Sequence, residues 1–169
     1  MTWDNDLYQC PYCLIEDCVP ASGNKNSSIL IIGEMPGDEE IKAGKPMVGR
    51  MGGVLRAELS RLGVDMRRMR LCNLWLHPPN KREDCFNYGV EQVIKEAQKK
   101  EAILLVGSDT IRYFCNVNVM SVNGLRVTSP YLSAPIIMAC VQPAAVFHGS
   151  IGEIRLALGK FAKAINGLM

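Results

Sequence analysis

The chain has 169 residues and a formal net charge of +2, and 48% of its residues are hydrophobic and 21% charged. These values indicate one globular domain with a single buried core, because a chain of this length has no room for a second one. They exclude the membrane-spanning class, since no run approaches the roughly 20 apolar residues that cross a bilayer, and so small a net charge does not by itself indicate a nucleic-acid-binding protein.

The amino-terminal segment carries the first chemical signal. It has acidic residues where a secretory signal has basic ones, which favours a cytoplasmic or nucleoid-associated location. In such a chain, seven cysteines favour metal or redox chemistry over disulfides. Cys10 and Cys13 form a CxxC pair that can hold one ion, with Cys18 as a further ligand. Three cysteines in apolar segments are interpreted as buried hydrophobic residues: Cys72, Cys115 and Cys140.

Four apolar segments predict β-strands at residues 29–32, 70–74, 102–106 and 135–141. Amphipathic patterns predict helices around 54–62 and 90–97, from Ser108 or Asp109 to Phe114, and over 151–165. This alternation predicts a three-layer α/β/α sandwich with a four-stranded parallel sheet. Residues 117–129, which contain an Asn-Gly pair at 123 and 124, predict a hairpin before the last strand.

The segment 31–53 reads IIGEMPGDEEIKAGKPMVGRMGG, which places a carboxylate directly after a strand and follows it with a glycine-rich loop. Glu34 is therefore expected at the carboxyl edge of the sheet, where open α/β folds bind their ligands. The glycines allow the backbone to approach a flat or anionic group, or they only satisfy the dihedral angles of an ordinary turn. Two further loops, 73–87 and 142–150, are expected at the same edge, so we expect the functional site there.

These residues resemble the iron-sulfur branch of the uracil-DNA glycosylase superfamily, called families four and five, over nearly the whole chain. The first motif of that family reads approximately GEAPG, an acidic pair and GxPFVGxxG, and it corresponds here to residues 33–37, 39–40 and 44–52. Asn73 and the prolines at 78 and 79 are similar to the second motif. Residues 142–144, Gln-Pro-Ala, are similar to the last motif, which is usually His-Pro-Ser/Ala.

The resemblance implies a monofunctional DNA glycosylase that hydrolyses the N-glycosidic bond of uracil, or of a related altered base, during base excision repair. In that reaction Glu34 would position water and Asn73 would read a base flipped out of single- or double-stranded DNA. As alternatives, Glu34 pairs with an arginine and Asn73 caps a turn. The residues implied to contact DNA around the pocket are Gly37, Gly49, Arg50, Pro143, Phe147 as a wedge, and His148.

Three pocket residues depart from the family pattern. Met35 replaces an alanine, Met47 replaces the phenylalanine that stacks on the base, and Gln142 replaces the histidine that contacts the leaving base. A glutamine amide donates to a carbonyl oxygen but cannot become an imidazolium, so we expect weak uracil cleavage or a pocket retuned to another base. The alternatives are a module that binds DNA or a modified base without cleaving it, and a nucleotide-processing enzyme that uses the same crevice.

The resemblance also implies a four-iron four-sulfur (4Fe-4S) cluster. Cys10, Cys13 and Cys85 fit its ligand positions, whereas His77 stands where the family has its remaining cysteine. Three arrangements follow: a cluster with His77 as a ligand, a cluster with Cys18 in its place, or a zinc site of the Cys3His type. We thus expect one glycosylase-like domain over 1–169, monomeric, with a metal-binding segment 1–28 packed on it.

Overall fold

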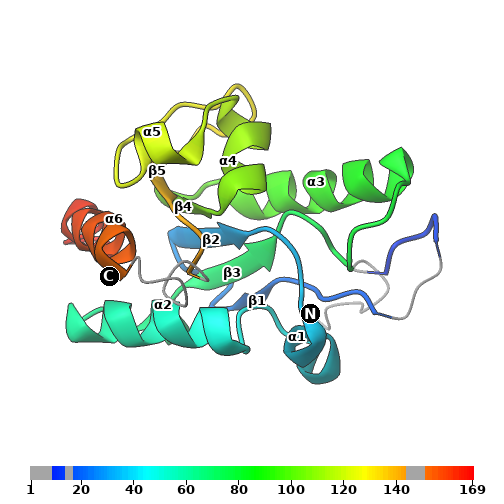
Figure 1. Ribbon diagram of the computed structural model, residues 1–169, viewed down its shortest axis with the longest axis horizontal. Coiled ribbons are helices and arrows are strands. Elements are labelled where there is room, and N and C mark those ends of the chain that lie inside the picture. The colour runs from blue at the N-terminus through cyan, green and yellow to red at the C-terminus, as the bar shows by residue number, and fades with distance from the viewer. Residues whose placement is uncertain (1–8, 14–16, 144–150) are drawn as a thin grey trace.

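Figure 1 shows the computed structural model, which describes residues 9–13, 17–143 and 151–169. Five strands form one sheet in the order β1-β3-β2-β4-β5. Four of them run parallel: β2 (Ile29–Gly33), β3 (Arg70–Asn73), β4 (Ala102–Val106) and β5 (Ile136–Cys140). The predicted α/β class and its four parallel strands are confirmed, and the structure adds β1 (Ser22–Gly23) as a short antiparallel edge.

The two central strands, β2 and β4, consist entirely of buried residues. Their sequences, ILIIG and AILLV, are continuous apolar runs because both faces of a parallel sheet are covered by helices. The register pairs Gly33 with Asn73 and Val106 with Cys140. The carboxyl ends of all four parallel strands therefore lie along one edge of the sheet.

Helices cover both faces of this sheet. The helices α2 (Arg50–Arg61) and α6 (Ile151–Ala164) lie on one face, and α3 (Glu83–Ala97) and α4 (Ser108–Cys115) lie on the other (Figure 1). The helices α2, α3 and α6 bury most of the apolar residues that predicted them, but Leu62, the last residue of the stripe predicted over 54–62, lies after α2 and is 47% exposed. Glu58 is buried on α2 and accepts a hydrogen bond from Arg155 Nε of α6 at 3.0 Å, which ties these two helices together. No helix in the described ranges has the length and apolar character needed to cross a membrane.

The predicted hairpin over residues 117–129 is wrong, because the short helix α5 (Val119–Val122) occupies part of this segment. Asn118 begins that helix by accepting a hydrogen bond from Met120 N at 2.8 Å. Asn123 Oδ1 accepts from Val141 N, and Asn123 Nδ2 donates to the Glu153 carbonyl, both at 2.9 Å. The asparagine thus satisfies backbone groups of two distant segments, and this tertiary role outweighs its local turn propensity.

The loop after β2 contains a helix that the sequence analysis did not predict. Residues Asp38–Ala43 form α1, whose first turn is acidic and whose C-cap is Gly44 at a φ of 66°. Acidic side chains stabilise the amino end of a helix through its partial positive charge. The helix α2 also begins earlier than predicted, at Arg50, and it follows the end of this loop. A 3₁₀ turn, η2 (Met66–Arg68), leads from α2 into β3.

Candidate active site at the carboxyl edge of the sheet

A pocket lies at the carboxyl ends of the parallel strands. It is lined by residues that end or follow β2, β3, β4 and β5. Six predicted site residues line it together: Glu34, Met35, Met47, Asn73, Gln142 and Pro143. The three loops that the sequence predicts at this edge therefore converge on one site.

Glu34 follows β2 directly and is held at the amino terminus of α4. Its Oε1 accepts a hydrogen bond from Asp109 N at 2.8 Å, so this carboxylate caps the helix for which Ser108 or Asp109 was expected to be the cap. An acidic group is favoured there because the first turn of a helix has unpaired N–H groups and a partial positive charge. Burial raises the pKa of Glu34 above its ordinary value, and the Asp109 N–H bond opposes that rise without cancelling it.

Gly107 makes room for this carboxylate. Its φ of 97° is a conformation that L side chains rarely adopt, and a Cβ at this position would overlap the Glu34 carboxylate. Its backbone N–H donates to the Cys140 carbonyl at 3.0 Å, which holds the turn against the end of β5. This contribution of the loop after β4 was not predicted from the sequence. The available signal was a glycine directly after an apolar strand, as at Gly33 before Glu34.

Asn73 ends β3 beside Gly33 and lies half-buried at the pocket. The backbone bonds continue past both strands: Leu74 N donates to the Gly33 carbonyl at 2.8 Å, and Trp75 N donates to the Glu34 carbonyl at 2.9 Å. These bonds set the amide of Asn73 and the carboxylate of Glu34 at adjacent strand ends. The side-chain oxygen of Asn73 lies 2.6 Å from where a Cβ on Gly33 would stand, so the glycine allows this close approach.

Met47 is a nearly buried residue of the pocket lining. It is only 8% exposed, and its Cε lies 3.3 Å from the same Cβ position of Gly33. Its backbone is fixed, because Arg56 Nη2 donates to the Met47 carbonyl at 3.1 Å and a Cβ on Gly52 would overlap that carbonyl. The cavity volume is about 40 Å³, whereas ligand pockets enclose roughly 300 Å³ or more. The pocket is therefore smaller than a typical ligand site.

The remaining predicted DNA-contact residues are not found in the described lining of this pocket. Gly37, Gly49 and Arg50 are not among the described residues that line it, although Gly37 N donates to Glu40 Oε1 at 3.3 Å. Phe147 and His148 lie outside the residues that the structure describes.

Six lining residues were not predicted as site residues: Gly33, Glu40, Met51, Gly52, Leu55 and Val106. Glu40 belongs to the acidic pair of the first motif, which was the available signal. Its Oε2 is buried and has no hydrogen-bond partner among the described residues.

A cluster of metal-ligating side chains lies beyond the end of β3. The ligand atoms of Cys10, Cys13, His77 and Cys85 all lie within 4.8 Å of one another. They come from the amino-terminal segment, the loop after β3 and the first turn of α3. Cys13 Sγ lies 3.2 Å from His77 Nε2, and His77 Nδ1 lies 2.8 Å from the Pro78 carbonyl. When Nδ1 carries the ring proton, it donates a hydrogen bond to the Pro78 carbonyl, and the lone pair of Nε2 is available to bind an ion.

Cys18 lies beside this cluster but outside it. Its Sγ accepts a hydrogen bond from Cys10 N at 3.2 Å, and burial raises the pKa of the Cys18 thiol. Of the two donor sets that the sequence allows, the structure brings together the one with His77 and not the one with Cys18. Cys72 and Cys140 are buried in the core and Cys115 is half-buried, as expected from their apolar surroundings.

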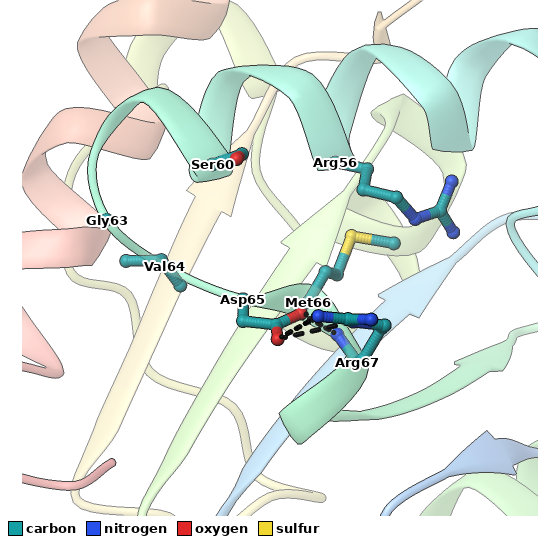
Figure 2. Close-up of a pocket in the computed structure, with 7 residues that line it drawn as sticks. All are labelled: Arg56, Ser60, Gly63, Val64, Asp65, Met66 and Arg67. Carbon is teal, nitrogen blue, oxygen red and sulfur yellow. Dashed lines mark hydrogen bonds and ion pairs between the residues drawn. The ribbon is translucent and has the colours of Figure 1, made fainter.

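A second hollow lies at the other end of α2. It encloses about 530 Å³ between the second half of α2 and the turn 63–67 (Figure 2). Arg67 donates to Asp65 there through Nε at 3.1 Å and Nη2 at 3.0 Å. Because this turn leads into the amino end of β3, the hollow is separate from the pocket at the carboxyl edge. None of the predicted site residues is among the described residues that line it.

Comparisons with known proteins agree with this geometry. The family model described as the uracil DNA glycosylase superfamily matches residues 20–164. The type-4 uracil-DNA glycosylase of Thermotoga maritima is 26% identical over 156 residues, which cover 86% of this chain and 80% of that protein. The type-4 uracil-DNA glycosylase of Archaeoglobus fulgidus is 32% identical over 107 residues. That of Pyrobaculum aerophilum is 36% identical over 86 residues. These two alignments cover 59% and 46% of this chain, and 53% and 44% of the relatives. The match to most of the chain confirms the resemblance that the motifs indicate: this chain belongs to the uracil DNA glycosylase superfamily.

Proposed function

We propose that this protein is a monofunctional DNA glycosylase that hydrolyses the N-glycosidic bond of uracil, or of a related altered base, in base excision repair. The observation that carries the proposal is the convergence of Glu34, Asn73 and Gln142 on one pocket from three separate strand ends. Membership of the superfamily and relatives named type-4 uracil-DNA glycosylase support the same reaction.

The chemistry of the bond explains the need for a carboxylate. As the bond breaks, positive charge develops on the sugar and negative charge on the departing base. We assign Glu34 to hold or polarise the attacking water beside the sugar. Asp109 N and the glycine at 107 position this carboxylate, and they do so before a substrate arrives. A fixed charge of this kind lowers the barrier without reorganising during the reaction.

We assign recognition of the base to two amides and two thioethers. The Asn73 amide can both donate to and accept from the Watson–Crick edge of a flipped uracil, and the Gln142 amide can donate to a base carbonyl. Met47 and Met35 pack against the base through polarizable sulfur. Because an amide stabilises an anionic base less than an imidazolium does, we expect slower cleavage than with a histidine at 142.

Around the pocket, the proposed contacts with single- or double-stranded DNA come from Gly37, Gly49, Arg50, Pro143, Phe147 and His148. A glycosylase of this kind acts on DNA as a monomer and resides in the cytoplasm or at the nucleoid.

We also propose a metal centre in which the amino-terminal segment 1–28 contributes Cys10 and Cys13, and the rest of the domain contributes His77 and Cys85. The resemblance implies a 4Fe-4S cluster, and zinc is the alternative that the same donors allow. In either form the centre ties the amino-terminal segment to the loop after β3 and to α3. The Val19 N–H, which donates to the Leu76 carbonyl at 2.7 Å, supports the same attachment.

A second candidate function is favoured by the three departures in the pocket. With methionine at 35 and 47 and glutamine at 142, the site retains groups that recognise a base while it loses a cationic donor for the leaving group. A protein of this kind would bind an altered base in DNA and not cleave it.

One experiment separates these functions. Uracil-containing single- and double-stranded oligonucleotides are incubated with the protein and then treated with alkali, which cuts the strand at abasic sites. We expect scission with the wild-type protein, loss of scission with Glu34→Gln, and wild-type scission with the exposed control Glu101→Gln. Tight binding without abasic sites would support the binding module, and equal scission by Glu34→Gln would refute the assigned mechanism.

A further inference from the structure

We infer that the metal centre holds a single tetrahedral zinc ion and not a 4Fe-4S cluster. This inference rests on the proposed metal centre and deepens it, but it does not depend on the glycosylase activity. Three features of the described residues carry it: the spacing of the donor atoms, the identity of the fourth donor, and the hydrogen bonds that orient the donors.

The spacing of the donor atoms fits one ion. Tetrahedral zinc binds sulfur at about 2.3 Å and nitrogen at about 2.0–2.1 Å, so two ligand atoms on one ion stand roughly 3.6–3.8 Å apart. Cys13 Sγ and His77 Nε2 are 3.2 Å apart, and all four donor atoms lie within 4.8 Å of one another. In a 4Fe-4S cluster each protein ligand binds a different iron, so the whole cluster stands between the ligands. Donors converged to this degree leave no room for four irons and four sulfides.

The identity of the fourth donor favours the same ion. Three cysteines and one histidine form one of the common ligand sets of structural zinc. Four-iron clusters are most commonly held by four cysteines, and the common histidine-ligated iron-sulfur centres are two-iron centres. His77 stands where the resemblance places the fourth cysteine, and it is completely buried. Cys18, the cysteine that could have restored a four-cysteine set, instead accepts a hydrogen bond from Cys10 N.

The surrounding hydrogen bonds orient the donors for a small ion. His77 Nδ1 faces the Pro78 carbonyl at 2.8 Å, and zinc-bound histidines commonly donate their other ring N–H to a carbonyl in this way. Asn80 Nδ2 donates to Cys85 Sγ at 3.5 Å, which orients that sulfur. The Trp75 ring lies 6.1 Å from the His77 ring, centroid to centroid, at an interplanar angle of 53°.

The four protein ligands complete the coordination shell of a tetrahedral ion, as in structural zinc sites. Cys10, Leu76 and Cys85 form a small buried cluster that is separate from the main core. An ion at its centre stabilises this part of the molecule where the apolar contacts are few. We therefore expect zinc removal to release the amino-terminal segment while the sheet remains folded.

Elemental analysis tests the inference on the full chain, expressed in medium that supplies both iron and zinc and purified without oxygen. We expect a colourless protein with about one zinc per chain. A brown protein with about four irons and four acid-labile sulfides per chain would overturn the inference and leave the metal centre in place. A folded protein without metal would overturn both. The oligonucleotide assay on the same preparation reports on the glycosylase proposal separately.

X-ray absorption at the zinc edge tests the ligand set without any variant. The expected first shell has three sulfurs at about 2.3 Å and one nitrogen at about 2.0–2.1 Å. A shell of four sulfurs would refute the role of His77. Among variants, His77→Ala is expected to lose zinc to a chelator much faster than the wild type. The matched control Cys18→Ser is expected to retain it, and loss of zinc from that control would contradict the assignment.

Discussion

The substitution Gly107→Ala isolates the part of the fold that positions Glu34. The φ of 97° and ψ of 156° at Gly107 belong to a region that is essentially restricted to glycine. The new methyl group would also overlap the Glu34 carboxylate, which must then leave Asp109 N. The substitution therefore disturbs the carboxylate without changing any group assigned to the chemistry.

Two effects set the expected magnitude. Backbone strain at this position costs about 1–3 kcal/mol of the free energy of unfolding, and loss of a hydrogen bond to a charged group costs about 1.5–3 kcal/mol more. For catalysis, the displaced carboxylate resembles a lost transition-state donor, which costs about 2.7–4 kcal/mol, or a factor of roughly 10² to 10³ in rate. We expect this loss in the single-turnover rate on a uracil-containing oligonucleotide, measured where the variant is fully folded.

Gly63→Ala is the matched control. Gly63 has a φ of 76°, but a Cβ there would meet nothing within 4 Å, and the residue lies at the far end of α2. We expect about 1–2 kcal/mol of strain in the unfolding free energy and an unchanged cleavage rate. If folded Gly107→Ala cleaved as fast as Gly63→Ala, the proposed positioning of Glu34 would be refuted.

Three further predictions concern pH, the pocket loop and a buried ion pair. Burial raises the pKa of Glu34 above the ordinary 4.5. The cleavage rate should therefore rise with pH through that higher pKa as the carboxylate ionises. A pH–rate profile whose acid limb lies at the ordinary pKa would contradict this. Because the folded state binds this proton more tightly than the unfolded chain, the stabilising contribution of Glu34 is present below pH 4.5 and is lost as pH rises through the folded pKa. In Gly52→Ala the new methyl group would push against the Met47 carbonyl, which should lower the free energy of unfolding by about 1–3 kcal/mol and raise KM. In Gly53→Ala the methyl group meets open space and should stabilise α2 by up to about 1 kcal/mol. Urea unfolding and KM measurements compare the two variants. Arg70→Ala should lower the free energy of unfolding in urea by about 3–5 kcal/mol. Arg70 binds the nearly buried Glu96 at 2.8 and 2.9 Å, and the substitution removes this partner of the carboxylate. The exposed Arg67 of Figure 2 is the control, and an equal loss with Arg67→Ala would refute the distinction between a buried and an exposed ion pair.

The sequence predicts the layers of this fold because burial and periodicity are local properties of the chain. The continuous apolar runs of β2 and β4 require helices on both faces, and the alternation of strands and helices requires parallel connections. Parallel connections in turn bring the ends of successive strands to one edge. That is why Glu34, Asn73 and Gln142 could be assigned to one site before their contacts were known.

Several contacts that fix the site and the fold around it join residues far apart in the sequence, and hydrophobic periodicity does not predict them. Glu34 accepts a hydrogen bond from Asp109 N, 75 positions away, because α4 begins directly after β4 and β4 pairs with β2. Cys13 Sγ lies 3.2 Å from His77 Nε2, 64 positions away in the sequence. Cys18, which is much nearer to Cys13 in the sequence, instead accepts a hydrogen bond from Cys10 N. Asn123 bonds to Val141 and Glu153 and not within a hairpin. In each case a polar group takes the partner that packing places beside it, since burial makes an unsatisfied group costly.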